Sequence, residues 1–197
     1  MKPDNSMRIC VDYRSVNLGS LSDPYPMKRA DDLLRKMAPA HFITTLDCTS
    51  GYYQIAMHPE SVPLISFITH RGQFEFLYMS FGLKTAGSTF QRMIDELLDR
   101  HQNYALGYID DVSVFSEGWS LHLEHLEKVL SECHEWGLTL KLKKCFFARP
   151  KVQFLGHIVG GGDISVVPEK IEVIRLMPEP STKNLFRSFR GMCGYYR

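Results

Sequence analysis

The sequence lacks several features that mark specialised classes of protein. It has no run approaching the roughly 20 apolar residues that a membrane span needs, and its N-terminus has no apolar signal core. Its five cysteines are scattered, odd in number and never in a Cys-x-x-Cys pair. It also lacks repeats and low-complexity tracts. We therefore expect a soluble, unexported protein with free thiols, and neither a disulfide scaffold, a zinc module, a fibre nor a disordered chain.

An excess of charge of one sign is also lacking. The 197 residues include 23 Lys and Arg against 22 Asp and Glu, a net charge of +1. Overall charge therefore does not indicate a nucleic-acid partner, and such a partner must be held by a local patch. One basic group could follow a nucleic-acid backbone or could simply protect an exposed strand edge. It comprises Lys141, Lys143, Lys144, Arg149 and Lys151.

The pattern of apolar residues and turn formers predicts an α+β protein, with an antiparallel sheet and helices packed on one face. Strands are expected at residues 8–13, 41–47, 104–109, 112–115 and 152–155. A hairpin is expected from 64–69 and 74–79 around 70–73, with Gly72 at positive φ. Helices are expected at 29–37, 85–100 and 120–136. This order contains the split βαββαβ unit of ferredoxin-like folds.

The predicted helix at 120–136 has the clearest amphipathic pattern. Ser120 is a plausible N-cap, and Gly137 ends the helix. His122 and His125 are expected on its exposed face rather than as metal ligands. Its inward stripe is predicted to comprise Leu123, Leu126, Val129, Leu130 and Cys133.

An acidic pair lies between two predicted strands. Asp110 and Asp111 are enclosed by apolar strands, where a two-residue turn would normally contain Asn-Gly or Asp-Gly. Two carboxylates about 4 Å apart repel by about 4 kcal/mol at an effective dielectric constant near 20. A bound Mg²⁺ would offset this repulsion.

A third carboxylate, Asp47, ends the predicted strand at 41–47. In a split βαββαβ sheet that strand neighbours the central hairpin, so the three acids can meet at one edge. Such a site could hold two Mg²⁺ ions that activate a primer 3′-hydroxyl and stabilise the leaving pyrophosphate. The alternative interpretation is that Asp110 and Asp111 form a surface turn and Asp47 is a helix cap.

Longer motifs extend along the chain in one order. Together they resemble the reverse transcriptases of gypsy-type long-terminal-repeat retroelements, and cover nearly the whole sequence. The motifs are residues 8–17, 45–55, 74–83, 89–91, 108–111, 122–126, 154–157 and 188–197.

The resemblance implies a polymerase right-hand fold with a ferredoxin-like palm. It implies fingers and palm at about 1–45 and 59–85, palm at 46–58 and 86–150, and primer grip with the start of the thumb or connection at 151–197. The implied activity is that of an RNA-directed DNA polymerase within a retrotransposon polyprotein. Such an enzyme adds deoxynucleoside triphosphates to a primer on an RNA or DNA template, using two Mg²⁺ ions, with Mn²⁺ as a substitute.

The resemblance also implies roles for individual residues. The acids Asp47, Asp110 and Asp111 would hold the metals, with the backbone carbonyl of Cys48 as a further ligand. Tyr52 would stack under the sugar and exclude a ribose 2′-hydroxyl. Phe81 would line the nucleotide pocket. The triphosphate would be bound by Lys2, Arg8 and the backbone amides of Thr49, Ser50 and Gly51. The primer grip would be formed by Phe154, Leu155, Gly156 and His157.

Two departures from the family pattern favour a different function class. Ser80 and Gly87 stand where the family usually has proline, and each lost proline costs about 0.4–1 kcal/mol in backbone entropy. A catalytically decayed remnant that binds nucleic acid or protein without catalysis is therefore the alternative hypothesis. A palm-type nucleotide cyclase is less favoured, because Tyr52 and the primer grip would have no purpose there.

The chain ends in an apolar, helix-like run at 195–197. We interpret this as a cut fragment rather than a natural end. Because the family copies RNA in cytoplasmic particles and delivers DNA to the nucleus, either location is expected. No membrane partner is expected, and the oligomeric state stays open.

Overall fold

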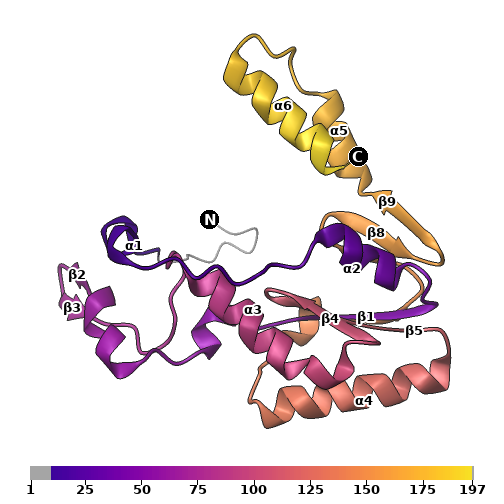
Figure 1. Cartoon of the computed structure of the whole chain (residues 1–197), viewed down its shortest axis with the longest axis horizontal. Helices are drawn as coiled ribbons and strands as arrows, with labels where there is room; N and C mark the ends of the chain where they lie inside the picture. The colour runs from indigo at the N-terminus through magenta and orange to yellow at the C-terminus, as the bar shows by residue number, and fades with distance from the viewer. Residues whose placement is uncertain (1–9, 197) are drawn as a thin grey trace.

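The computed structural model describes residues 10–196, with a four-stranded antiparallel sheet at the centre (Figure 1). The strand order is β4-β5-β1-β6. The strands are β1 (Phe42–Asp47), β4 (Ala105–Tyr108), β5 (Asp111–Ser116) and β6 (Phe146–Arg149). Helix α3 (Ala86–Leu97) precedes β4, and α4 (Trp119–Glu135) joins β5 to β6. The chain thus follows β1-α3-β4-β5-α4-β6, and the predicted ferredoxin-like unit is confirmed.

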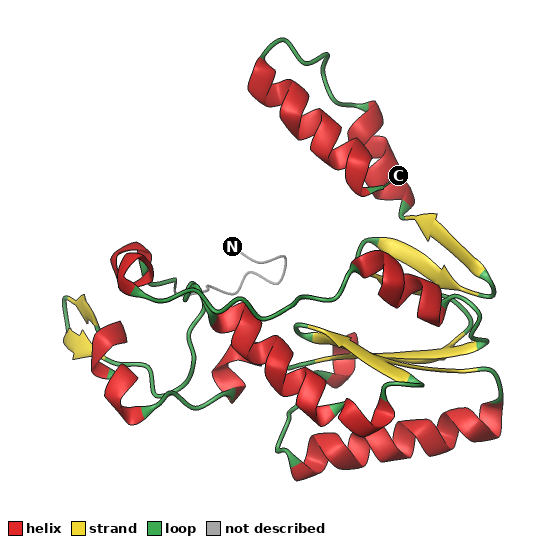
Figure 2. Cartoon of the chain, viewed as in Figure 1, coloured by secondary structure: helices red, strands yellow, loops and turns green. Residues whose placement is uncertain are grey.

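Helices α3 and α4 cover one face of this sheet, as predicted (Figure 2). Alternate strand residues point toward them, because side chains of a strand alternate between its two faces. The resulting core is nearly free of solvent, with no side chain named here more than 2% exposed. It includes Leu46, Val112 and Val114 from the strands, Phe90 and Ile94 from α3, and Val129 and Cys133 from α4.

The opposite face of the sheet is covered at one end only. Helix α2 (Ala30–Met37) and a three-stranded sheet pack there around Ile43, at the start of β1. The three-stranded sheet consists of β7 (Val152–Phe154), β8 (His157–Gly160) and β9 (Asp163–Val166). The other end of β1, where Asp47 lies, faces a pocket instead.

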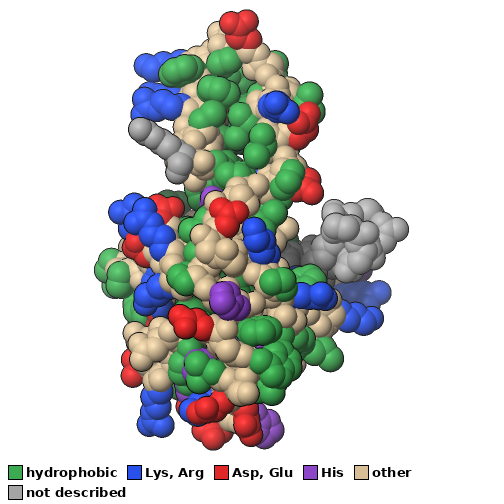
Figure 3. All heavy atoms as spheres, turned by 90° about the vertical axis from the view of Figure 1, so that its right-hand side faces the viewer, with side chains coloured by type: hydrophobic (Ala, Val, Ile, Leu, Met, Phe, Trp, Pro, Cys, Tyr) green, Lys and Arg blue, Asp and Glu red, His purple; other side chains and the backbone are tan. Residues whose placement is uncertain are grey.

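The remaining elements extend from this centre (Figure 1). Helices α5 (Pro168–Arg175) and α6 (Lys183–Tyr195) project away from the sheet. Figure 3 shows hydrophobic side chains gathered along this pair, where Leu176 and Phe186 are exposed.

In the part of the chain that the structure describes, no helix has the length and apolar character to cross a membrane. The short elements are α1 (Arg14–Gly19), β2 (Phe67–Thr69), β3 (Gly72–Phe74) and the 3₁₀ turns Gly51–Gln54, Pro59–Ser61, Pro63–Ile65, Asp99–His101 and Leu142–Lys144.

The hairpin predicted at 64–79 is present in a shorter form. Strands β2 and β3 pair Phe67 with Phe74, and the turn is His70–Arg71. Gly72 has φ 124°, so the predicted positive φ is confirmed.

The predicted strand at 8–13 is wrong for the residues that the structure describes. Residues 10–13 form no strand, and α1 follows directly. Side-chain bonds hold this segment in place of a strand ladder. The Tyr13 hydroxyl donates to the carbonyl of Ile65 at 3.3 Å, and the Asn17 amide donates to that of Gly82 at 2.8 Å.

Helix α4 buries Val129 and Cys133 of the predicted stripe and packs Leu126 and Leu130 against the core, but differs from the prediction in its first turn. His122, expected at the surface, is 0% exposed, whereas Leu123 is 48% exposed. The His122 ring hydrogen-bonds through Nε2 with Thr44 Oγ1 at 2.8 Å and through Nδ1 with Ser116 Oγ at 3.1 Å. These partners on the sheet satisfy a polar ring whose burial would otherwise be costly. The N-cap position is Gly118 rather than Ser120.

A glycine substitution tests how closely α3 packs on the sheet. A Cβ on Gly107 of β4 would collide with Ile94 Cγ2 and lie 3.2 Å from Leu98 Cδ1. We expect Gly107→Ala to lower the free energy of unfolding by about 1–3 kcal/mol, measured by urea denaturation. Gly191→Ala in α6 is the matched control, because nothing lies within 4 Å of its Cβ, and it should be neutral or stabilising by up to about 1 kcal/mol. Equal effects of the two substitutions would contradict this packing.

Candidate active site

The acidic turn lies one residue earlier than predicted. Tyr108 pairs with Asp111, so the central residues of the turn are Ile109 and Asp110, and Asp111 begins β5. Ile109 has φ 52°, a conformation that is rare for a β-branched residue. The prediction followed the usual preference for polar residues at both turn centres, and here an isoleucine occupies one of them.

The three acids gather at one end of the central sheet. Asp47, the last residue of β1, is the register partner of Asp111. The next amide along, that of Cys48, donates to the carbonyl of Asp110 at 3.0 Å. Asp47 and Asp111 therefore lie side by side on adjacent strands, with Asp110 at the adjoining turn.

The negative charges in this group affect one another. Desolvation first, and then the charge of Asp47, raise the pKa of Asp111, while Lys144 acts in the opposite direction. Burial above all, with the nearby Cys133 and the acids, raises the pKa of the Cys48 thiol. Cys48 is thus a buried thiol of the core. Its backbone carbonyl is the atom that the resemblance implies as a metal ligand.

Lys144, one member of the basic group found in the sequence, supplies a positive charge beside the acids. Its Nζ lies 2.7 Å from Asp47 Oδ2. The hydrogen bond to Asp47 raises the pKa of Lys144. The short 3₁₀ turn Leu142–Lys144 therefore brings a cation from a distant part of the sequence to the acids.

The donor atoms of this group suit a hard divalent cation. Among residues 10–196, no three or more His, Cys, Asp or Glu side chains are arranged as they stand to hold a metal ion. Mg²⁺, however, usually takes only one or two protein carboxylates and completes its shell with water and substrate phosphates. The adjacent carboxylates of Asp47 and Asp111 fit that requirement. Desolvation first, and repulsion from Asp47 second, raise the pKa of Asp111, and a bound cation would offset both.

A pocket of about 440 Å³ joins the acids to the turn between β7 and β8. The two residues of that turn, Leu155 and Gly156, have φ 46° and 75°, the pattern of a type I′ hairpin. Phe154 and His157 flank the turn as register partners. His157 Nδ1 hydrogen-bonds with the Leu155 carbonyl at 2.9 Å. The predicted primer-grip residues thus form one hairpin, and three of them line the same pocket as Asp47 and Asp111, namely Phe154, Leu155 and Gly156.

The turn after β1 approaches Asp110 closely. Ser50 has φ 51°, and a Cβ on Gly51 would collide with Asp110 Oδ1 and lie 3.2 Å from Phe90 Cζ. Glycine is therefore required at position 51. The Thr49 amide donates to the Thr139 carbonyl at 2.8 Å, so in this structure it is bonded within the chain, and its role in triphosphate binding stays a prediction.

Tyr52 and Phe81 lie together beside this turn. Their ring centroids are 5.0 Å apart, and Tyr52 also contacts Phe90 at 5.8 Å. Burial and the charge of Asp110 raise the pKa of Tyr52. The predicted nucleotide-pocket aromatics are thus neighbours, close to the acidic turn. Lys2 and Arg8 lie outside the described residues.

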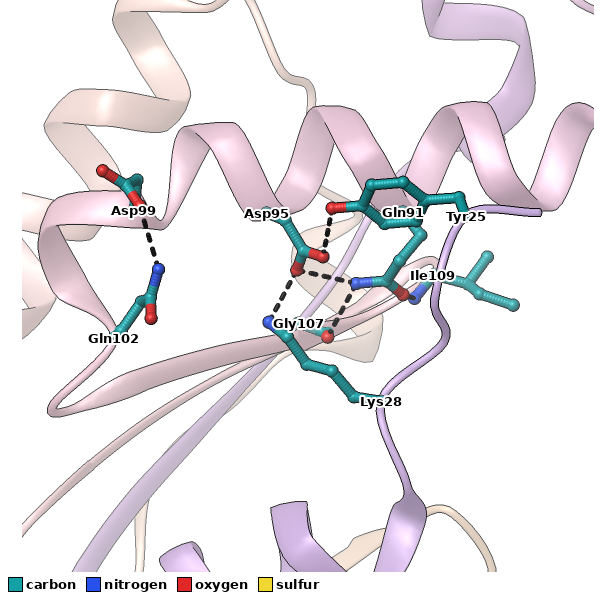
Figure 4. Close-up of polar contacts among 8 residues, drawn as sticks. All are labelled: Tyr25, Lys28, Gln91, Asp95, Asp99, Gln102, Gly107 and Ile109. Atoms are coloured by element: carbon teal, nitrogen blue, oxygen red, sulfur yellow. Dashed lines mark hydrogen bonds and ion pairs between the residues drawn. The ribbon is translucent and has the colours of Figure 1, made fainter. Parts of the chain in front are cut away.

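One residue that holds the turn, Gln91, is not among the predicted site residues. Gln91 of α3 hydrogen-bonds with the backbone of Gly107 in β4 and of Ile109 in the turn (Figure 4). It belongs to the 89–91 motif, but nothing in the local pattern distinguishes a buried amide from an exposed one. Its role becomes visible only when α3 is packed on the hairpin.

The chain is similar in sequence to a family of known proteins. The family model described as "Reverse transcriptase (RNA-dependent DNA polymerase)" matches residues 1–159. The Pol polyprotein from transposon opus of Drosophila melanogaster is 38% identical over 98% of this chain, and that from transposon gypsy is 36% identical over 96%. The chain spans only 19% and 18% of these two relatives' own lengths.

The fold is shared with solved structures. A foamy viral protease-reverse transcriptase in complex with double-stranded DNA matches with a TM-score of 0.91 and 24% identity, over 100% of this chain and 35% of that one. The same kind of protein with an RNA/DNA hybrid matches with a TM-score of 0.85, over 100% of this chain and 26% of that one. These similarities show a polymerase palm architecture.

The raised pKa of Asp111 predicts a stabilising substitution. Because the pKa of Asp111 is raised in the folded chain, its ionised form opposes folding, and stability falls as the pH rises above the ordinary Asp pKa of about 3.9. We expect Asp111→Asn to raise the melting temperature slightly at pH 7.5 in metal-free buffer. The gain in the free energy of unfolding should be no more than about 1 kcal/mol, because solvent screens the charge of an exposed carboxylate.

The gain from Asp111→Asn should vanish near pH 3, where Asp111 is protonated in both states. Calorimetry at the two pH values measures it. A gain of the same size at both would show that the charge is not its cause.

Proposed function

This chain belongs to the reverse transcriptase (RNA-dependent DNA polymerase) family, among those of gypsy-type retrotransposons, and from that premise we propose that it adds deoxynucleotides to a primer 3′-hydroxyl. The template would be RNA or DNA. The observation that carries the proposal is the register pairing of Asp47 with Asp111 beside the turn that bears Asp110.

We propose that these carboxylates bind two Mg²⁺ ions, with the Cys48 carbonyl as a further ligand and Mn²⁺ as a substitute. Bound Mg²⁺ would supply charge neutralisation at the attacking and leaving oxygens. The chain's own contribution is to fix the ligand positions. Asp47 and Asp111 are held by the strand pairing, and Asp110 by the turn and by the close approach of Gly51.

The nucleotide would lie on the side of the acids where Tyr52 and Phe81 meet. Tyr52 is held by contacts with Phe81 and Phe90, so its ring has little freedom to move aside for a ribose 2′-hydroxyl. Lys2, Arg8 and the backbone at Ser50 and Gly51 would bind the triphosphate. Guanidinium and backbone N–H groups suit phosphate oxygens.

The primer end would lie in the pocket between the acids and the β7–β8 turn. Supporting this, Leu155 and Gly156 line that pocket together with Asp47 and Asp111. Lys143 also lines it and is exposed, so it is the member of the basic group best placed to contact a phosphate. We assign residues 46–58 and 86–150 to the palm, 1–45 and 59–85 to fingers and palm, and 151–197 to the primer grip and start of the thumb.

A decayed, non-enzymatic remnant is the second candidate, because Ser80 and Gly87 replace prolines of the family. The fold accommodates both residues. Ser80 is buried, with its hydroxyl donating to the Phe81 carbonyl at 3.3 Å, and Gly87 lies in the first turn of α3. The acids are intact, which favours the polymerase.

Primer extension decides between the two candidates. We expect Mg²⁺-dependent incorporation of dTTP on poly(rA)/oligo(dT) by the chain, expressed with whatever flanking sequence its gene supplies. Asp110→Asn should lower the rate by at least about a hundredfold, because it removes a charge needed in the transition state. Asp99→Asn, at a carboxylate that accepts a hydrogen bond from the Gln102 side chain, is the matched control and should retain activity. Incorporation by Asp110→Asn at the parent rate would sink the mechanism, and a folded parent that incorporates nothing would favour the remnant.

The sugar-selection role of Tyr52 has its own test. Replacing the ring by Val removes the steric block while leaving the metal acids in place. We expect Tyr52→Val to raise the ratio of rUTP to dTTP incorporation by about tenfold or more, measured as kcat/KM for each nucleotide. Tyr53→Val, on the neighbouring ring that contacts Phe76 and Phe81, serves as the control. The same ratio in both variants would argue against a specific role for Tyr52.

A further inference from the structure

A fully buried amide holds the acidic turn from behind. Gln91 of α3 is 0% exposed. Its Oε1 accepts the backbone N–H of Ile109 at 2.8 Å, and its Nε2 donates to the Gly107 carbonyl at 3.1 Å. Figure 4 shows the side chain reaching from the helix to the strand end. One side chain thus bonds the backbone near the end of β4, at Gly107, and at Ile109, the first central residue of the acidic turn.

These bonds act on a strained position. Ile109 has φ 52°, and the left-handed region is unfavourable for a non-glycine residue. A hydrogen bond to its amide offsets part of that cost. Asp110 follows directly, so the direction of its carboxylate depends on how this residue is held.

Packing alone does not account for an amide at position 91. An apolar side chain of similar volume would fill the space, whereas a buried amide costs free energy unless its polar atoms are bonded. Gln91 meets this requirement through the turn and through one further partner. Its Nε2 also donates to Asp95 Oδ1 at 2.9 Å, one helical turn along α3.

Asp95 connects Gln91 to a distant segment. Lys28 Nζ lies 2.6 Å from Asp95 Oδ1, and the Tyr25 hydroxyl donates to Asp95 Oδ2 at 2.8 Å. Asp95 therefore receives three donors, two of them from the chain between α1 and α2 (Figure 4). Because only the NH₂ group of Gln91 can donate to the Asp95 carboxylate, Asp95 fixes the orientation of the amide and leaves Oε1 to accept the Ile109 N–H.

We propose that Gln91, oriented by Asp95, is a positioning residue for the acidic turn, and that Asp95 couples this turn to the segment that carries Tyr25 and Lys28. Gln91 touches neither substrate nor metal and acts through the backbone of Ile109. The inference rests on the proposed polymerase function, because that function gives the position of Asp110 its importance.

Four variants test the proposal. Gln91→Met keeps the volume and loses both bonds to the turn. Asp95→Asn removes the charge that orients the amide. Gln102→Met is the matched control for the first, because Gln102 donates to Asp99 and neither touches the turn. Asp23→Asn is the control for the second, because Asp23 anchors the same segment through Arg92 at 2.9 Å without contacting Gln91.

We expect Gln91→Met to lower kcat for dTTP by about 10- to 100-fold and to raise the Mg²⁺ concentration for half-maximal rate, as for residues that orient metal ligands. The KM for dTTP and the affinity for primer-template should be unchanged. Asp95→Asn should show the same changes at smaller size. Gln102→Met and Asp23→Asn should match the parent, and thermal unfolding checks that every variant folds. If Asp23→Asn reproduced the effect of Asp95→Asn, detachment of the segment would be the cause and the coupling through Gln91 would be wrong.

Amide hydrogen exchange of Ile109, followed by NMR, gives a readout that does not need activity. The parent amide is bonded to Gln91, so its exchange should accelerate at least about tenfold in Gln91→Met and stay unchanged in Gln102→Met. If the parent incorporates no dTTP, the proposed function fails, and exchange alone still decides whether Gln91 holds the turn. If the parent is active but Gln91→Met behaves as Gln102→Met in kcat and Mg²⁺ dependence, this inference fails while the function stands. Unchanged exchange in Gln91→Met overturns it in either case.

Discussion

The register of β1 against β5 is the constraint on which the rest of the site depends. It sets Asp47 opposite Asp111 and, one residue earlier, Leu46 opposite Val112. The first pair faces the pocket and the second faces α3 and α4. A slip of one residue would turn every side chain of β1 to the other face. The same alternation therefore builds the apolar core and brings the carboxylates together, and neither can be altered without the other.

Much of this arrangement could be predicted from local pattern. The strand ending at Asp47, the hairpin around Asp110 and the helices between them follow from periodicity and turn chemistry, and their order identifies the sheet. The shift of the turn to Ile109 could not be predicted, because a buried glutamine from another element holds that backbone. The same holds for His122, whose ring is satisfied by hydroxyls on the sheet. Strand β6 was not predicted, since it is largely exposed and irregular at Ala148.

Backbone strain is concentrated around the acids. Among the described residues, the non-glycine positions with positive φ are Ser50, Ile109, Ala148 and Leu155. Ile109 precedes Asp110, Ser50 precedes the Gly51 that approaches Asp110, and Leu155 lines the pocket with Asp47. Such conformations cost about 1–3 kcal/mol each and persist only where the surroundings over-determine them. Here Gln91 holds Ile109, and the Tyr195 hydroxyl donates to the Leu155 carbonyl at 3.1 Å. The strain is thus met by side chains from α3 and α6, which makes the geometry around the acids a property of the whole fold.

The strand order also governs how the chain can fold during synthesis. Strand β1 lies in the middle of the sheet, between β5 and β6, yet it leaves the ribosome before either of them. Both of its hydrogen-bonding edges stay unpaired until residues 111–116 and 146–149 have emerged. Non-local pairing of this kind slows folding and leaves an apolar strand open to wrong partners. During synthesis, β1 therefore has no partner strand in this sheet until more than sixty residues after its own end have been added, and it gains its second partner, β6, only later still.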